Sequence, residues 1–539
     1  MSTLDLQPGR PGRRLIGGAP EGHDARVLGN LARMAGKAGL LHVTQDDVRA
    51  ARLIDALRFF APDVEVVSFP AWDCLPYDRV SPNGEIVGAR IDALTRLLVP
   101  AAKPRLVVTT INAVLQRVPP RASLAGASFR ARSGDRVDVD ALQRFLAHSG
   151  YMRAQTVREP GEYAVRGGII DLYPAGLPNP VRLDFFGDAL ESIRSFDPES
   201  QRTVGTLRSL DLVPMSEVQL TTESIKRFRQ AYVATFGAPT RDDRLYEAIS
   251  EGRRYPGLEH WLPLFHDHLD TLLDYVPGIP VVFDALADDA AAERLAQVKD
   301  YYDARRENMG QNQPGVAPYR PLSPDQLYVR PEEWSERANA LPLARLTPFA
   351  VPEAGAPRIV VDCGARQGRN FIAERADENA NVFEAVIRHI RDQQAQGRRV
   401  ILGAWSDGSR ERLCHVLQDH DLRQTKPIGR FSEAMAYPRN EIPVGIWPLE
   451  HGFETADLTV VSEQDILGDR LVRQKRKSRR PQDFLTEVAA LTPGDLVVHV
   501  DHGIGRFEGL KTIEAAGAPH DCLELHYAGG DRLFLPVEN

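Results

Sequence analysis

Short β-rich segments alternate with helical segments through the first 110 residues, and this alternation restricts the fold more than any other feature of the sequence. The β-rich runs are GLLHVTQ (39–45), VEVVSFP (64–70) and RLVVTT (105–110). Between them, DDVRAARLIDALRFF and EIVGARIDALTRLL carry apolar residues at helical spacing. Strands that alternate with helices predict a parallel sheet with crossover helices. An α/β domain is therefore expected at the N-terminal end.

From about residue 131 the pattern changes to short strands separated by tight turns. GGIIDLYP, VRLDFF and ALESIRSF follow one another, with AGLPN and GD between them, and this spacing predicts a β-meander. Helical and α/β patterns return from about Thr222. We therefore expect a β-rich domain at 131–215, inserted into an α/β domain made of 1–130 and 216–345.

A chain of 539 residues is too long for a single core, and the remaining sequence divides further. A Pro-rich stretch around 312–356 is typical of a linker or extended segment. Residues 346–468 predict a second α/β domain, and 469–488 a linker whose basic run LVRQKRKSRR is more typical of a solvated linker than of a phosphate-binding patch. The last residues, 489–539, return to β-rich runs with Gly-rich turns and predict a small β-barrel.

Composition excludes several classes of protein. A hydrophobic content of 43% and a charged content of 26% are ordinary for globular protein, and no apolar run approaches the roughly 18 residues of a membrane span. The N-terminus lacks the features of a secretory signal, so a cytoplasmic location is expected. The four cysteines form no C-x-x-C pair. A net charge of −8 leaves no global field for nucleic acid, which makes proteins the first partners to consider.

Gly17-Gly-Ala-Pro-Glu-Gly22-His23-Asp24 has the glycine spacing of a phosphate-binding loop, but His23 and Asp24 replace the Lys and the Ser or Thr that bind phosphate and Mg²⁺. Asp24 would bring negative charge to the triphosphate. The run VVFD ending at Asp284 resembles a Walker B strand, yet Ala-Leu-Ala follows where a helicase has its catalytic carboxylate. We therefore predict a degenerate RecA-like domain, without ATP hydrolysis and without a cofactor.

Two stretches resemble the UvrB-homology module of bacterial transcription-repair coupling factors: WDCLPYDRVSP (72–82) and REPGEYAVRGGIIDLYP (158–174), which continues to RLDFFGD (182–188). HGF (451–453) and EQDILG (463–468) support the resemblance, and GDLVVHVDHGIGRF (494–507) resembles the start of that family's CarD-like, RNA-polymerase-interacting domain. The resemblance implies a UvrB-like domain with an inserted UvrA-binding domain, a further α/β domain, and a polymerase-binding domain. The family's ATP-driven DNA translocase motor, which uses ATP and Mg²⁺, would follow, so the chain is expected to be a fragment with an incomplete barrel.

Period-2 alternation places Arg182, Asp184 and Phe186 on one face of a strand, and Leu183 with Phe185 on the other. An aromatic side chain among charges has the composition of a binding hot spot, although a solvated strand face with one stray Phe explains the pattern equally well. The resemblance implies that Arg166, Arg182 and Phe186 contact UvrA. Their guanidinium groups would then pair with carboxylates of the partner.

In the terminal module, Leu523, Leu525 and Tyr527 alternate with Glu524 and His526, so one face should pack and the other should be wet. The resemblance implies contact with the β subunit of RNA polymerase near Lys511, Ile513 and Glu514. His499, Asp501 and His502 lie on alternating faces near a Gly turn and lack a fourth ligand, so no metal site is expected.

The favoured function is a non-enzymatic adaptor in transcription-coupled nucleotide excision repair, which binds stalled RNA polymerase and recruits UvrA. DNA contact would come mainly from the family's motor. One alternative is a helicase-like enzyme that binds nucleotide in its α/β units. Another is a CarD-like transcription regulator without a repair partner.

Overall fold

A computed structural model describes residues 12–240, 243–307, 319–351, 359–377, 379–468, 494–499, 503–515, 518–527 and 530–536. The chain divides into two compact units, residues 1–468 and 469–539. Among the described residues, the first unit has three main sheets and a separate two-stranded pair, and the second unit has one four-stranded sheet. The prediction of a multidomain α/β chain is confirmed at this level.

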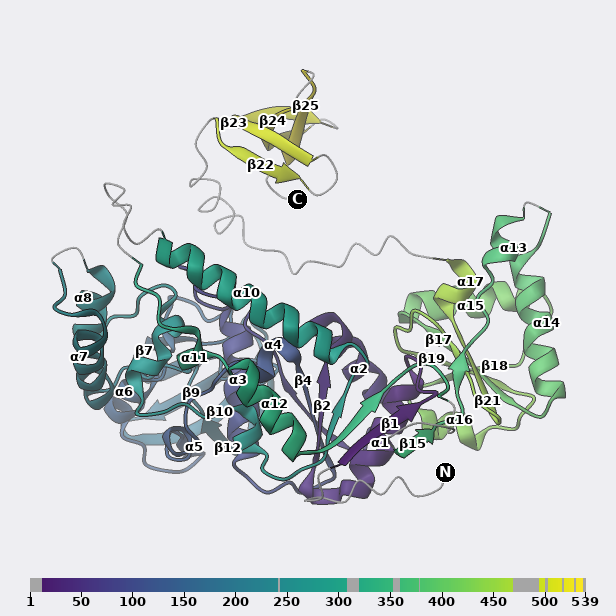
Figure 1. Cartoon of the computed structure of the whole chain (residues 1–539), viewed down its shortest axis with the longest axis horizontal. Helices are drawn as coiled ribbons and strands as arrows, with labels where there is room; N and C mark the ends of the chain where they lie inside the picture. Colours follow the sequence, from purple (N-terminus) through teal and green to yellow (C-terminus); the bar gives the residue numbers. More distant parts are fainter. Residues whose placement is uncertain are drawn as a thin grey trace. The chain divides into compact units, whose positions relative to one another are not determined.

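A seven-stranded parallel sheet is the centre of the first unit (Figure 1). Its strand order is β15 (Ile359–Asp362), β1 (Gly12–Gly17), β14 (Pro342–Leu346), β13 (Val281–Phe283), β2 (Leu40–Thr44), β4 (Arg105–Thr110) and β3 (Glu65–Phe69). β2, β3 and β4 are the three strands predicted from the first 110 residues. Because every pairing is parallel, all strands end at one carboxyl edge.

Helices cover both faces of this sheet, as the near-continuous apolar strands require. One face packs against α1 (His23–Ala35) and α2 (Asp47–Phe60). The other packs against α3 (Gly84–Leu97), α4 (Ile111–Val114), α9 (Leu272–Tyr275), α10 (Ala287–Glu307) and α12 (Pro331–Ala340). Adjacent residues of β2 divide between the two cores: Leu40 faces α1 and α2, whereas Leu41 faces the opposite layer.

Two corrections concern the end of this sheet. The Pro-rich stretch predicted as a linker contains α11 (Pro324–Leu327), α12 and the interior strand β14. β15 pairs with β1, although the sequence analysis placed residues 346–468 in the next α/β domain. The local patterns of β14 and β15 are weak, and their place in the sheet comes from pairing with β1, which is distant in sequence.

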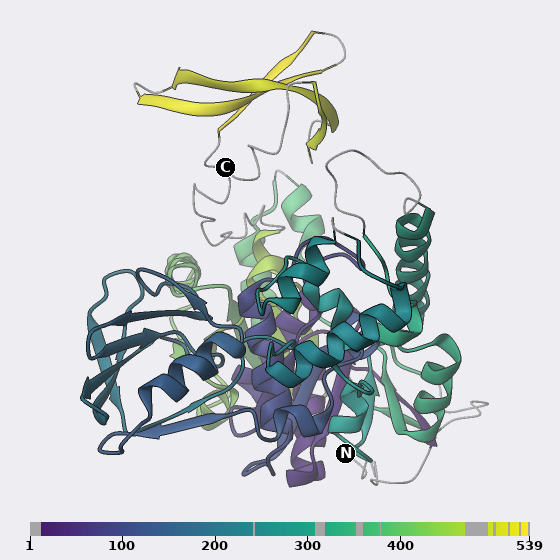
Figure 2. The same cartoon turned by 90° about the vertical axis from the view of Figure 1, so that its left-hand side faces the viewer.

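The segment between β4 and β13 contains a second sheet. It is a meander of β7 (Glu162–Arg166), β8 (Ile169–Leu172), β9 (Val181–Phe186), β10 (Ala189–Phe196) and β11 (Thr203–Leu207), with β6 (Met152–Arg153) at its edge. Helix α6 (Val139–His148) packs on one face of this sheet through Leu142 and Leu146 (Figure 2, blue). A separate pair, β5 (Phe129–Arg132) with β12 (Ser209–Leu212), joins the two ends of the segment.

A short helix, α5 (Arg121–Leu124), precedes the meander in the chain. After the meander, α7 (Thr222–Phe236), α8 (Arg244–Ser250) and the 3₁₀ helix η2 (Leu258–Phe265) share a core.

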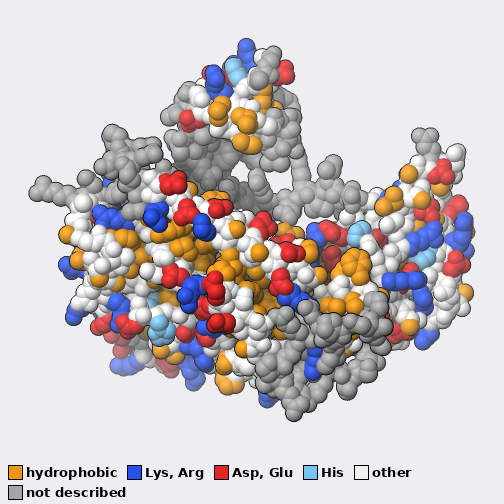
Figure 3. Space-filling view, in the orientation of Figure 1, with side chains coloured by type: hydrophobic (Ala, Val, Ile, Leu, Met, Phe, Trp, Pro, Cys, Tyr) orange, Lys and Arg blue, Asp and Glu red, His pale blue; other side chains and the backbone are white. Residues whose placement is uncertain are grey.

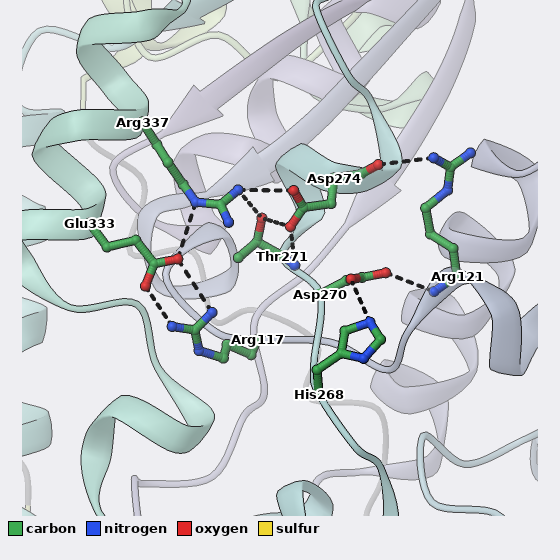
Figure 4. A network of polar contacts seen from close by, with 8 residues as sticks. All are labelled: Arg117, Arg121, His268, Asp270, Thr271, Asp274, Glu333 and Arg337. Atoms are coloured by element: carbon green, nitrogen blue, oxygen red, sulfur yellow. Dashed lines mark hydrogen bonds and ion pairs between the residues drawn. The ribbon is translucent and has the colours of Figure 1, made fainter.

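Polar contacts connect α9 and α12 with the loop that contains Arg117 (Figure 4). Arg117 binds Glu333 of α12 at 2.5 Å, and Arg337 of the same helix binds Asp274 of α9 at 3.0 Å. These ion pairs link segments more than 60 residues apart in sequence.

The third sheet contains β16 (Arg366–Gln367), β20 (Phe453–Glu454), β21 (Leu458–Ser462), β17 (Arg399–Ala404), β19 (Ile442–Ile446) and β18 (Thr425–Ile428) in that order. Helices α13 (Ile372–Ala376), α14 (Val382–Ala395), α15 (Asp407–Asp419), α16 (Phe431–Ala436) and α17 (Glu463–Leu467) accompany it. An aromatic cluster joins it to α2: Phe59 stacks on Trp447 with ring centroids 4.0 Å apart. The seven-stranded sheet and the third sheet, both in the first unit, therefore share one hydrophobic core.

The terminal unit is an antiparallel sheet of β22 (Leu496–His499), β23 (Gly503–Ala515), β24 (Ala518–His526) and β25 (Arg532–Pro536). Its described strands do not close into the barrel that the sequence predicted. β23 and β24 form a long hairpin with a bulge at Gly509, whose φ of 147° favours glycine. The predicted basic linker, 469–488, lies outside the described residues. No helix in the described part of the chain is both long and apolar enough to cross a lipid bilayer.

Candidate binding surfaces

The glycine-rich loop lies at the carboxyl edge of the seven-stranded sheet, between β1 and α1. A phosphate-binding loop uses its backbone N–H groups to hold phosphate oxygens. Here the N–H of Gly18 donates to the carbonyl of Phe349 at 2.9 Å, and the N–H of Ala19 donates to that of Thr347 at 3.0 Å. Two backbone N–H donors of the loop are therefore already hydrogen-bonded to carbonyls of the segment directly after β14.

Both glycines inside this loop have positive φ and lie against other parts of the chain. At Gly18, with φ of 63°, a Cβ would lie 2.4 Å from Oδ1 of Asp362. At Gly22, with φ of 84°, a Cβ would lie 2.9 Å from the side chain of Leu449. Gly17, the first glycine of the predicted frame, is also closely covered, by Phe349 and Val351. Close packing thus explains the glycines without a bound phosphate.

The two residues that replace the catalytic Lys and the hydroxyl are both buried. The His23 ring lies 5.2 Å from that of Phe453, and burial, with a smaller contribution from Arg26, lowers the pKa of His23 to about 4. His23 is therefore neutral near pH 7. Asp24 is 1% exposed and forms an ion pair with Arg49 of α2. Its carboxylate faces that guanidinium.

The second candidate surface is the face of the meander opposite α6. Leu183 is buried and Phe185 packs against the same core, whereas Phe186 is 78% exposed. The two faces predicted for β9 are thus confirmed. Phe186 has the largest exposed fraction among the large hydrophobic side chains that the structure describes.

Arg182 is not free to offer both arms to a partner, and this corrects the sequence-based expectation. Its Nε and Nη2 donate to the two carboxylate oxygens of Asp171 at 2.7 and 2.8 Å. Its guanidinium also lies 4.9 Å from the ring of Phe196. The hydrogen bonds to Asp171 raise the pKa of Arg182 further. Only one edge of this guanidinium remains for a partner.

Asp184 and Arg166 are also held by neighbours. Asp184 accepts hydrogen bonds from Ser192 at 2.6 Å and from Arg194 at 2.9 Å. Arg166 donates to the backbone of Gln155 and to Thr156 Oγ1. The polar groups on this face therefore pair largely with one another.

Sequence analysis missed Ile169 on this surface. It lies directly across the sheet from Asp184 and Arg166, and it is 36% exposed. The alternation in Ile169-Ile170-Asp171-Leu172 carried the signal, because Ile170 and Leu172 are buried in the α6 core. The surface defined by Arg166, Ile169, Arg182, Asp184 and Phe186 is hereafter called the meander face.

The third candidate surface lies on the terminal sheet. Leu523 and Leu525 are buried and pack with Tyr527, as predicted, whereas Glu524 pairs with His526 at 2.9 Å. Lys511 is exposed, with its Nζ 3.8 Å from Glu524 and 5.6 Å from the ring centroid of Phe534. Ile513 and Glu514 belong to β23, opposite His520 and Pro519, and their side chains lie outside the description. So do the side chain of His499 and all of Asp501 and His502.

Sequence analysis missed an apolar group on the β22–β23 hairpin. Leu496, Val498 and Ile504 are 70%, 77% and 66% exposed, and Val498 lies directly opposite Ile504. No metal-binding group of His, Cys, Asp or Glu occurs in the described ranges. On the face of the molecule in Figure 3, acidic and basic side chains are interspersed, with no broad basic area among the coloured residues.

This combination defines a multidomain α/β protein with an inserted β-rich module and a separate terminal β module. Family comparisons match three parts of the chain. Residues 129–218 match the UvrB interaction domain, 393–466 match the MFD D3 domain, and 491–539 match the CarD-like/TRCF RID domain.

Several curated relatives carry the name transcription-repair-coupling factor. The protein of Haemophilus influenzae is 31% identical over 562 residues, which cover 100% of this chain and 46% of that protein. The Escherichia coli protein is 32% identical over 100% of this chain and 45% of its own length, and the Bacillus subtilis protein is 25% identical over 98% and 45%. The chain thus matches three domain families, aligns over nearly its whole length with these relatives, and spans about half of their length.

Proposed function

We propose that this chain is the docking portion of a transcription-repair-coupling factor, which recruits UvrA through the meander face and contacts the β subunit of RNA polymerase through the terminal sheet. The match of residues 129–218 to the UvrB interaction domain supports the first contact. The match of residues 491–539 to the CarD-like/TRCF RID domain supports the second. Holding both partners on one chain would bring the repair machinery to a transcribing polymerase.

Phe186 is the observation that carries the UvrA contact. A Phe side chain that is 78% exposed next to self-paired charges is the arrangement of an interface hot spot, in which one aromatic anchor is surrounded by polar groups. The ion pairs Asp171–Arg182 and Asp184–Arg194 fix the side chains around it before binding. Since these charges already have partners, burying Phe186 would supply most of the binding free energy.

Binding of UvrA to purified chain tests this proposal. Phe186→Ala should weaken binding by roughly 30-fold, which corresponds to the ~2 kcal/mol of a hot-spot aromatic, with an unchanged melting temperature. Val204→Ala is the matched control, because Val204 is 57% exposed on β11 of the same sheet. Equal affinities for the wild-type chain and Phe186→Ala would refute the meander face as the contact. Arg182 is a poor choice for this test, since its loss leaves the buried carboxylate of Asp171 unpaired.

For the terminal sheet, the same logic selects Val498, which is 77% exposed on β22. Val498→Asp should abolish retention of RNA polymerase and leave UvrA binding intact, because the two surfaces lie in separate compact units. A chain that retains polymerase but never UvrA would instead support the CarD-like regulator. Loss of both UvrA and RNA polymerase binding in Val498→Asp would contradict the assignment of each partner to a separate surface.

We infer that the seven-stranded sheet of this chain does not bind ATP. The engaged N–H groups of Gly18 and Ala19 and the buried His23 support this inference. The residues present do not fit a nucleotide with Mg²⁺. Titration with a fluorescent ATP analogue tests the helicase-like alternative, since saturable micromolar binding that a His23 substitution abolishes would favour that enzyme.

A further inference from the structure

The positions that hold Mg²⁺ in a working phosphate-loop site are occupied here by two buried carboxylates. In such sites the metal is held by the Ser or Thr at the start of the helix and by the Asp that ends the Walker B strand. Asp24 has the first position, in the first turn of α1, and Asp284 has the second, directly after β13. Asp24 is 1% exposed and Asp284 is 7% exposed.

One guanidinium contacts both of these carboxylates. Arg49 Nη2 pairs with Oδ2 of Asp24, and Arg49 Nε lies 3.7 Å from Oδ2 of Asp284. The second oxygen of Asp284 lies 3.3 Å from Nε2 of His42, on the adjacent strand β2. Oδ2 of Asp284 makes no hydrogen bond in the structure, so its interaction with Arg49 is purely ionic.

The start of α2 positions Arg49 beside Asp24 and Asp284. α2 follows β2, the neighbour of β13, and Asp46 caps the helix by accepting the backbone N–H of Arg49 at 2.7 Å. The first turn of α2 therefore begins at the carboxyl edge of the sheet, within reach of Asp284. Two carboxylates withdrawn from water repel one another unless one of them takes up a proton or a cation lies between them, and here Arg49 supplies the cation.

We propose that the Arg49 guanidinium is a built-in replacement for the divalent cation of the phosphate-loop site, and that its removal exposes a cryptic Mg²⁺ or Mn²⁺ site made by Asp24 and Asp284. Arg49 supplies a fixed positive charge from within the chain, so the junction of α1, α2 and β13 needs no metal.

Thermal unfolding of the full chain in EDTA, MgCl₂ and MnCl₂ tests the proposal. The wild-type melting temperature should be the same in all three. Arg49→Ala should melt about 5 °C lower in EDTA and recover at least half of that loss in millimolar MnCl₂. Arg49→Gln is a second variant that removes the charge and preserves most of the side-chain volume, and it should respond in the same way.

Two controls isolate the site. Arg52→Ala removes another arginine of α2, whose partner Glu450 is partly exposed, and its melting temperature should not respond to Mn²⁺. Asp284→Asn added to Arg49→Ala should eliminate the Mn²⁺ response. The proposal is overturned if Mn²⁺ raises the melting temperature of the wild-type chain, or if neither Arg49 variant binds Mn²⁺ by titration calorimetry.

Discussion

Arg90 of α3 should be one of the side chains whose loss destabilises the first unit most, because its charge is completely enclosed. Its Nε lies 2.5 Å from Oε1 of Glu217, and both side chains are 0% exposed. The guanidinium also donates to the carbonyl of Pro70 at 2.9 Å and lies 4.3 Å from the ring of Phe69. Glu217 lies one residue before the end of the segment matched to the UvrB interaction domain, so the pair links that segment to α3, which covers the parallel sheet.

The magnitude follows from the burial. Breaking a buried pair by removing one partner costs ~3–5 kcal/mol, because the remaining charge stays out of water without compensation. Arg90→Met should therefore lower the free energy of unfolding by that amount. Replacing both partners, in Arg90→Met with Glu217→Met, removes the stranded charge as well, and should restore all but roughly 1–2 kcal/mol.

Urea denaturation followed by tryptophan fluorescence measures these differences, and one of the five tryptophans, Trp72, contacts the pair directly, since its indole N–H donates to Glu217 at 3.0 Å. Arg58→Met is the control: Arg58 pairs with Asp55 on the surface with its side chain 73% exposed, so its loss should change stability by less than ~1 kcal/mol. If Arg90→Met were no more damaging than Arg58→Met, or if the double variant were as unstable as the sum of the singles, the reasoning would be wrong.

Two further predictions concern the junction between the first and third sheets. Phe453→Ala should cost ~3–5 kcal/mol by urea denaturation, because the ring is 0% exposed and truncation leaves a cavity beside His23 and Phe60; a loss below ~1 kcal/mol would show that the junction collapses without it. His23 has a pKa lowered to about 4 by burial, so between about pH 6.5 and 4 the unfolded state takes up a proton that the folded state does not. His23 should thereby lower stability by ~3 kcal/mol as the pH decreases through that window, alongside His260 and His266, whose pKa values burial also lowers to about 4. His23→Leu should reduce this part of the slope; an unchanged slope would exclude His23 as a source.

Sequence periodicity was sufficient where the apolar pattern of a segment itself shows which of its faces are buried. The alternation through β9 placed Phe186 on the outer face and Leu183 inside, because strand geometry alone assigns alternate residues to opposite faces. The β-rich runs that became β2, β3 and β4 carried enough apolar residues to identify buried parallel strands. The motifs also indicated which domain families the meander and the terminal sheet resemble.

Tertiary structure alone decided how the charged residues pair. Arg182 and Asp171, or Arg49 with Asp24 and Asp284, meet only because their strands and helices are assembled in a particular order. The sequence showed that Asp24 is incompatible with a triphosphate, but not that an arginine from α2 neutralises it.

The same limit applies to β14 and β15, which carry weak local patterns and become strands by pairing on either side of β1. The glycine-rich loop shows the division most clearly. Its spacing and its missing Lys were legible in the sequence, whereas the carbonyls of Thr347 and Phe349 that occupy its N–H groups come from more than 300 residues away. Local patterns determine which conformation a segment prefers, but the free energy of long-range contacts depends on which segments the fold brings together.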